Sequence, residues 1–127
     1  MKIKSLDHLV LTVADIEKTC QFYQNVLDMD VVTFDSSRKA LKFGQQKINL
    51  HQKGHEYEPK AQYPTPGSAD LCLIAETNLT DVILELQQKQ ISIEQGPIVK
   101  HGALGDIKSI YFRDPDQNLI EISNYLA

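Results

Sequence analysis

The chain carries the same order of patterns twice: a strand-like run, a helical stripe and three further strand-like runs. The first copy opens with residues 7–13, where apolar, β-branched residues alternate with other types. A helical stripe then follows at steps of four, three and four residues: Ile16, Cys20, Tyr23 and Leu27. Asp15 precedes the stripe and is expected to be the N-cap of the helix. A repeat of this length limits the fold to paired, similar modules.

The second copy opens with residues 69–74, again a strand-like run. Thr80 is the expected N-cap of its helix, whose stripe consists of Leu79, Val82, Ile83 and Leu86. Each helix is followed by three predicted strands: residues 29–34, 40–43 and 47–52, then residues 91–94, 108–112 and 119–123. Both halves therefore have the order βαβββ.

The two halves are joined by residues 54–68, which contain Pro59, Pro64 and Pro66 and are the one linker-like stretch. We expect a single domain over residues 1–127, with module one at about 1–53 and module two at about 69–127. The offset between the halves is 70 − 8 = 62 at the first strand and 121 − 51 = 70 at the last. Residues 96–105 are expected to supply the extra length as a loop.

Composition excludes several classes of function. The 13 basic and 17 acidic residues give a net charge of −4, which argues against a protein that binds nucleic acid backbones. No apolar run approaches the roughly 20 residues of a membrane helix. No signal-peptide pattern opens the chain, so a cytoplasmic location is expected. Cys20 and Cys72 are then expected to be small buried hydrophobic residues rather than a disulfide or a nucleophile.

Four polar residues occupy matching places in the two halves. His8 and Asp70 open the first strand of each half, and His51 and Glu121 lie on the last strand, each after an aliphatic residue. Two imidazoles and two carboxylates form a ligand set for a divalent transition metal. Each residue alone is better explained as a polar strand-edge residue, but the duplication favours the metal site because random polar residues need not match in both halves.

The sequence resembles the vicinal oxygen chelate superfamily, which includes glyoxalases, bleomycin-resistance proteins and extradiol dioxygenases. Three segments carry the resemblance: residues 7–13, the helix with Phe22, Tyr23 and Leu27, and residues 112–122, the most specific motif. Further segments resemble the glyoxalase domain-containing protein 5 type: residues 38–41, 48–51, 58–61 and 123–125.

The resemblance implies an α+β fold of two tandem βαβββ modules that form an incomplete barrel around a metal. Bacterial glyoxalase I has His, Glu, His and Glu at its four ligand positions, and the matching positions here hold His8, His51, Asp70 and Glu121. The inventory is the same, but the types at the middle two positions are exchanged. Asp70 also departs from the extradiol dioxygenases and fosfomycin-resistance enzymes, which have His at that position.

The function implied is a metal-dependent lyase or isomerase, similar to lactoylglutathione lyase, that chelates a small oxygenated substrate. The metal would be Ni, Zn, Co, Mn or Fe, and Glu121 would be the catalytic base. No glutathione-binding motif is recognisable. Two alternatives stay open: an Fe(II)-dependent dioxygenase, and a non-catalytic protein that binds a small molecule or antibiotic. The resemblance also implies a homodimer, with the site formed within one chain or with His8 and His51 from one protomer and Asp70 and Glu121 from the other.

Other candidates carry less weight. Arg38, Lys39 and Lys60 could bind carboxylates, but solvated surface charge is the simpler interpretation. Phe34 and Tyr57 are expected to contribute packing rather than a substrate platform. His55 is expected at the surface, and Lys100 and His101 lie in a glycine-containing segment that is more typical of a hairpin loop than of an anion site.

Overall fold

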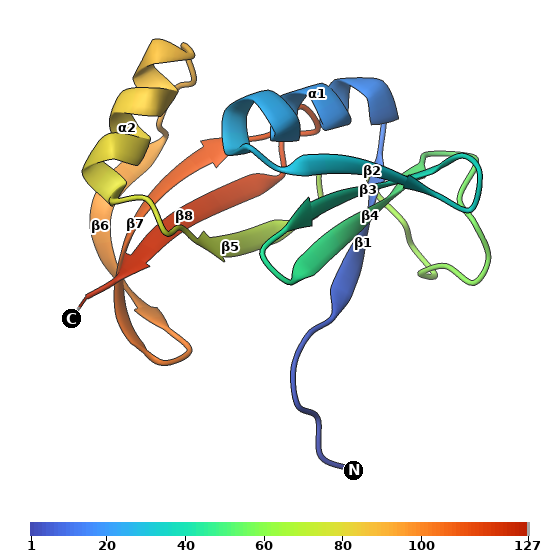
Figure 1. Cartoon of the computed structure of the whole chain (residues 1–127), viewed down its shortest axis with the longest axis horizontal. Coiled ribbons are helices and arrows are strands. Elements are labelled where there is room, and N and C mark those ends of the chain that lie inside the picture. Colours follow the sequence, from blue (N-terminus) through green and yellow to red (C-terminus); the bar gives the residue numbers. More distant parts are fainter. Residues whose placement is uncertain (127) are drawn as a thin grey trace. The chain divides into compact units, whose positions relative to one another are not determined.

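The computed structural model describes residues 1–126 and divides the chain into two compact units, Met1–Gly67 and Ser68–Ala127. Each unit is a four-stranded mixed sheet with one helix, built in the predicted order βαβββ (Figure 1). The α+β fold with two such modules is therefore confirmed. The described part of the chain contains no helix that is long and apolar enough to cross a membrane.

Unit 1 has the elements β1 (His8–Val13), α1 (Ile16–Leu27), β2 (Asp30–Phe34), β3 (Arg38–Phe43) and β4 (Gln46–Gln52). The strand order is β1-β4-β3-β2, and β1 pairs in parallel with β4. The parallel pair needs the crossover that α1 provides. Asp15 is the N-cap, as predicted, because its carboxylate accepts a hydrogen bond from the Lys18 backbone N at 3.1 Å.

The alternation of residues along the strands gives the sheet of unit 1 two different faces. Its aliphatic face packs against α1, whose Tyr23 is fully buried. The buried strand residues on this face are Leu11, Val13, Leu41, Ile48 and Leu50. The opposite face, which we call the open face, therefore receives the residues of the other parity, including the polar ones.

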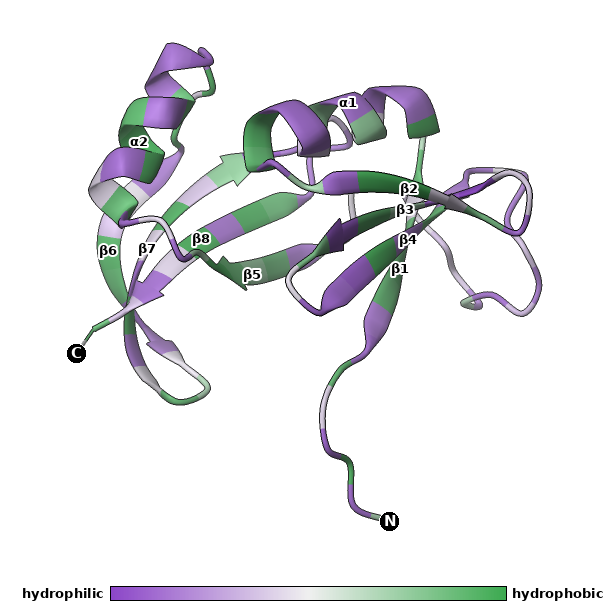
Figure 2. Cartoon of the chain, viewed as in Figure 1, coloured by the Kyte–Doolittle hydropathy of each residue, from purple (hydrophilic) through white to green (hydrophobic). Residues whose placement is uncertain are grey.

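Unit 2 has the elements β5 (Asp70–Ile74), α2 (Leu79–Gln88), β6 (Gln95–Gly102), β7 (Gly105–Arg113) and β8 (Leu119–Tyr125), in the strand order β5-β8-β7-β6. Hydrophobic and hydrophilic residues alternate along β8 (Figure 2). One face carries Ile110, Phe112, Ile120 and Ile122, which are buried with the apolar stripe of α2. The opposite face of this sheet, the open face of unit 2, carries Asp70, Ser109, Tyr111 and Glu121.

The turn before β8 fixes the register of that strand. Asp114 Oδ1 accepts hydrogen bonds from the backbone N of Asp116 and of Asn118, both at 2.9 Å. The Asn118 carboxamide oxygen then accepts from the Ala69 backbone N at 2.8 Å and so ties the start of β8 to the start of β5. These bonds explain why the acidic and amide residues of the motif are buried.

Two local predictions for unit 2 are wrong. The N-cap of α2 is Asn78, whose carboxamide oxygen accepts from the Thr80 backbone N at 3.0 Å, rather than Thr80 itself. The predicted strand at 91–94 and loop at 96–105 are replaced by β6 and a short turn into β7. Gly96 and Pro97 hid this strand, because an edge strand tolerates both residues at a bulge, and the register shifts between Gln95 and Ile98.

Candidate metal-binding residues on the open faces

The register of each parallel strand pair identifies the equivalent positions of the two units. In unit 2 Cys72 pairs with Glu121, and in unit 1 Val10 pairs with Asn49. Asn49 is therefore the structural counterpart of Glu121, and the offset at the last strand is 121 − 49 = 72 rather than 70. His51 lies two residues further along β4, where its counterpart in β8 is Ser123.

The carboxylate of Glu121 is held by hydroxyl groups of unit 2. Ser109 Oγ on β7 donates to Glu121 Oε2 at 2.6 Å, and Ser109 and Ser123 Oγ lie 2.6 Å apart. Both serines are fully buried, so the carboxylate has little freedom to turn. Such a bond to one carboxylate oxygen orients the group for a ligand, as outer partners do at metal centres.

Tyr111 and Asp70 complete the polar surface around Glu121. Tyr111 lies directly opposite Glu121 on β7. Burial, followed by the charge of Glu121, raises the pKa of Tyr111 to about 12, so the phenol stays protonated and can donate. Asp70 lies on β5, two residues from the partner of Glu121 and on the same face. Unit 2 thus presents two carboxylates on one face.

His8 opens β1 with its imidazole half exposed, and its Nδ1 lies 2.7 Å from Asp7 Oδ2. When Nδ1–H donates to this carboxylate, the lone pair of the neutral ring is on Nε2. A histidine oriented in this way by a carboxylate is the usual arrangement of a metal-ligating imidazole. His8 is therefore suited to the role that the sequence predicts for it.

His51 has a different environment. Its side chain is buried, with 3% exposed, and its Nε2 is 3.4 Å from Arg38 Nη2. A guanidinium only donates, so Nε2 is the acceptor of this long contact and the ring proton is on Nδ1. Burial, followed by the charge of Arg38, lowers the pKa of His51. In this arrangement the lone pair of His51 faces Arg38, and a metal at Nε2 would have to displace that side chain.

The structure brings some of the predicted ligands together and separates others. Asp70 and Glu121 are near one another on their sheet, whereas His8 and His51 are four residues apart in register. At about 3.3 Å per residue this is about 13 Å of sheet. Within residues 1–126 no group of three His, Cys, Asp or Glu side chains is close enough to hold a metal ion.

Asn49 is a candidate that the sequence analysis missed. It is buried midway between the register positions of the two histidines, and its Oδ1 is buried without a hydrogen-bond partner. An unpaired buried oxygen is costly, and a cation is one group that would satisfy it. The signal was present in the sequence: Asn49 is flanked by aliphatic residues on both sides, as Glu121 is.

The two cysteines are free thiols in the described structure, as expected, but only Cys20 is partly buried. Cys72 is exposed on the open face of unit 2, where its Sγ is 3.3 Å from Ser123 Oγ, so its expected burial is wrong. The alternation of β5 turns Cys72 to the face of its partner Glu121. Reduced contact with solvent at the sulfur raises the pKa of both thiols, which disfavours the reactive thiolate.

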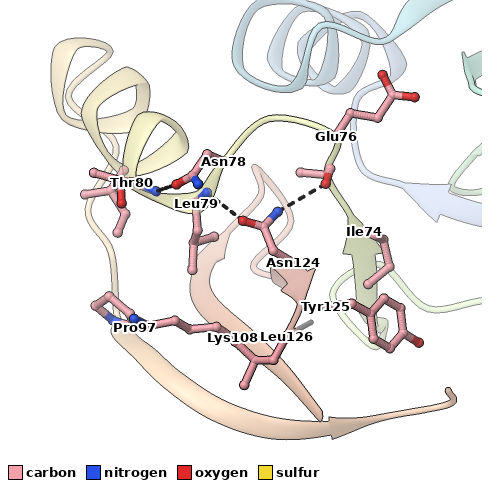
Figure 3. A pocket seen from close by; sticks show the side chains of 12 residues that line it. Ile74, Glu76, Asn78, Leu79, Thr80, Pro97, Lys108, Asn124, Tyr125 and Leu126 are labelled. Carbon is pink, nitrogen blue, oxygen red and sulfur yellow. Dashed lines mark hydrogen bonds between the residues drawn. The ribbon is translucent and has the colours of Figure 1, made fainter. Parts of the chain in front are cut away.

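A cleft of about 620 Å³ lies at the start of α2 in unit 2, lined in part by Pro97, Lys108 and Tyr125 (Figure 3). Its polar groups already bind one another. Asn124 Oδ1 accepts from the Leu79 backbone N at 2.7 Å, and its Nδ2 donates to the Ala75 carbonyl at 3.1 Å (Figure 3). The first N–H groups of the helix are thus capped by Asn124 and Asn78, and we interpret this cleft as structural.

The lowered pKa of His51 gives a testable expectation. In an NMR titration its ring resonances should show a midpoint below the ordinary value of about 6.5. Between the lowered pKa of the folded state and about 6.5, the unfolded chain binds more protons than the folded chain. The free energy of unfolding should therefore rise with pH over this range. His51→Gln should identify the resonance and remove this part of the pH dependence. A midpoint at or above 6.5 would contradict the buried, Arg38-facing imidazole.

Comparisons with known proteins agree with the fold. The sequence profile described as "Glyoxalase/Bleomycin resistance protein/Dioxygenase superfamily" matches residues 5–122. Virulence protein STM3117 of Salmonella typhimurium is 60% identical over 99% of this chain and 88% of that protein. The crystal structure of that protein matches this chain with a TM-score of 0.98. The match covers 99% of this chain and 100% of that structure.

Three further relatives extend the comparison. Glyoxalase domain-containing protein RDO1 of Mycosarcoma maydis is 54% identical over 98% of this chain and 70% of that protein. An integron cassette protein of Vibrio cholerae is 56% identical, with a TM-score of 0.97 over 99% of this chain and 98% of that structure. Metallothiol transferase FosB of Staphylococcus epidermidis is 29% identical over 96% of this chain and 82% of that protein.

Proposed function

This chain belongs to the glyoxalase/bleomycin resistance protein/dioxygenase superfamily, and we propose that it is a metal-dependent lyase or isomerase acting on a small oxygenated substrate. One observation carries the proposal: the carboxylates of Asp70 and Glu121 share the open face of one sheet, and Ser109 holds Glu121. Paired carboxylates without a lysine or arginine in ion-pair contact, within the part of the chain described, suit a cation.

The proposed ligands are His8, Asp70 and Glu121, with His51 or Asn49 as the fourth. The free lone pair of His8 and the unpaired Oδ1 of Asn49 support these two residues, whereas Arg38 already occupies the lone pair of His51. This set has mostly oxygen donors and one or two imidazoles. It would suit Mn, Fe or Co, and also Ni or Zn.

When bound, the metal would supply Lewis acidity toward neighbouring oxygens of the substrate. The protein's own part is to place a base beside the substrate. Glu121 is the proposed base, because its second oxygen is fixed by Ser109 and the carboxylate can carry a proton between adjacent carbons. Tyr111, a protonated phenol opposite Glu121, is placed to donate a hydrogen bond to developing negative charge.

The superfamily description leaves two alternatives: an Fe(II)-dependent dioxygenase, and a non-catalytic binding protein of the bleomycin-resistance kind. Asp70 in place of a histidine favours the binding protein, because it weakens the imidazole content of the site. The name of FosB, a metallothiol transferase, supports metal dependence instead. We also propose a cytoplasmic homodimer, and sedimentation velocity would test the dimer.

Metal content distinguishes these functions. Protein purified without a chelator or histidine tag should contain about one divalent ion per chain by elemental analysis. His8→Ala should lose the ion. Comparison of Asn49→Ala with His51→Ala then identifies the fourth ligand, and we expect the larger loss for Asn49→Ala. Metal-free protein that cannot be loaded, yet binds aromatic or drug-like ligands, would support the binding protein. Oxygen uptake by the iron-loaded protein would support the dioxygenase.

A further inference from the structure

We propose that Arg38, His51 and Tyr57 form a subsite on unit 1 that binds a carboxylate group of a small anionic ligand. We call these three residues the anion subsite. It lies at the start of β3 and the end of β4, away from the register position of His8. Nothing in the family description or in the names of the relatives assigns a role to it.

The guanidinium of Arg38 is fixed by aromatic rings. Its Cζ lies 4.4 Å from the ring centroid of Tyr57 and 5.0 Å from that of Phe34. The Tyr57 ring also packs edge-on against His51, with centroids 5.6 Å apart. Stacking of this kind leaves the planar edge of a guanidinium as the part that binds a partner. The simpler interpretation of Arg38 as solvated surface charge is therefore not supported.

Arg38 has no acidic partner among the described residues, and its Nε is buried without a hydrogen bond. Arg113, the other arginine of the chain, offers a comparison because its guanidinium has hydrogen-bond acceptors within the protein. Arg113 donates from Nε and Nη2 to the two oxygens of Glu94 at 2.9 and 3.0 Å, and from Nη1 to the Gln117 carbonyl at 3.2 Å. Arg38 lacks this fork of acceptors, and a ligand carboxylate would supply it.

The charges around the anion subsite favour an anion. Lys47 Nζ lies 4.4 Å from the ring centroid of Phe34 and adds positive charge on the same side. Glu56, whose charge acts on His51, is engaged by Lys60 at 3.6 Å, and Lys60 also contacts Glu58 at 3.5 Å. Glu56 also accepts a hydrogen bond from the Gly54 backbone N at 2.8 Å. These acids are therefore held by other groups and do not neutralise Arg38.

A carboxylate fits this subsite better than a phosphate. The two rings confine the guanidinium to one plane, and a planar carboxylate matches its edge with two parallel hydrogen bonds. A tetrahedral dianion would leave oxygens and charge outside this plane.

The assignment of this anion to the substrate rests on the proposed function. The substrate is then a small carboxylic acid that has further oxygen atoms for binding a metal. Binding of the carboxylate itself requires no metal. The experiment can therefore be done on metal-free full-length protein, and its failure would leave the proposed metal chemistry untouched.

The chain has only two arginines, so two Nε–Hε resonances are expected in the NMR spectrum. We would titrate the metal-free protein with acetate, pyruvate, malonate and succinate, with acetamide as the uncharged control and inorganic phosphate as the competing anion. The Arg38 resonance should shift saturably with at least one carboxylate and not with acetamide. The Arg113 resonance is the internal control and should stay unchanged.

Two variants test the assignment. Arg38→Lys keeps the charge but loses the planar fork, and should weaken carboxylate binding at least about 10-fold. Tyr57 is 37% exposed, so the fold should persist in Tyr57→Leu. The variant loses one of the two rings that contact Arg38, so carboxylate binding should weaken by a few-fold. Equal shifts of both arginines, no saturable shift with any carboxylate, or tighter binding of phosphate than of every carboxylate would overturn the proposal.

Discussion

Replacing Glu121 by glutamine should lower the affinity for a divalent metal at least about 100-fold and abolish any metal-dependent turnover, while the fold stays intact. Glutamine has nearly the same shape, and its amide still fits beside the Ser109 hydroxyl that now binds Oε2. The substitution removes the negative charge that a cation prefers and the carboxylate that would act as base. Loss of outer partners of metal ligands alone costs about 10–100-fold, so loss of a ligand should exceed that range.

The matched control is Glu94→Gln, which removes the same charge from the same unit. Glu94 is exposed and paired with Arg113, and it is not one of the proposed ligands, so metal affinity should change less than about 3-fold. Ser109→Ala should fall between the two, with a loss of about 10–100-fold, because Glu121 keeps its charge but loses its orienting bond. Isothermal titration with Co(II) or Mn(II) would measure all three. Glu121→Gln protein that binds metal as the wild type does would remove Glu121 from the site.

The fold was predictable because its signals are local. Alternation of residue types predicts the strands β1, β4, β5 and β8. Helical stripes predict α1 and α2, and Asp15 marks the start of α1. The edge strand β6 was missed because its partner β7 stabilises it, despite Gly96 and Pro97. Tertiary pairing of this kind overrides a local pattern and cannot be inferred from the segment alone.

The candidate site was only partly predictable. Glu121 and Asp70 share one face of the sheet, as period-two alternation along the strands predicts. The choice between Asn49 and His51 depends on strand register, and both lie on the same face of β4, so alternation does not separate them. A metal-ligand search that expects histidine also passes over an asparagine. Arg38 was assigned to the surface because its two ring contacts come from Phe34 and Tyr57, in different segments.

Replacing Gly96 by alanine should destabilise the protein by about 3–5 kcal/mol. Gly96 has φ +106°, a conformation that an L side chain rarely adopts, which costs about 1–3 kcal/mol. A Cβ at this position would lie 2.4 Å from the Ser109 carbonyl oxygen and 2.9 Å from the Ile110 Cα. Both are backbone atoms of β7, so β6 would have to move away, and overpacking of this kind costs about 1–3 kcal/mol more. Urea unfolding followed by circular dichroism would measure the change.

Gly44→Ala is the matched control, because Gly44 also has a positive φ, +51°, but a Cβ there would have no atom within 4 Å. Its cost should be about 1 kcal/mol, so the difference between the two variants isolates the contact with β7. The contact also bears on function. Displacement of β6 at Ser109 would disturb the residue whose hydroxyl holds Glu121, so Gly96→Ala should weaken metal binding as well as folding, whereas Gly44→Ala should not. Equal costs for the two glycines would show that β6 and β7 are less closely packed at Ser109 than this structure has them.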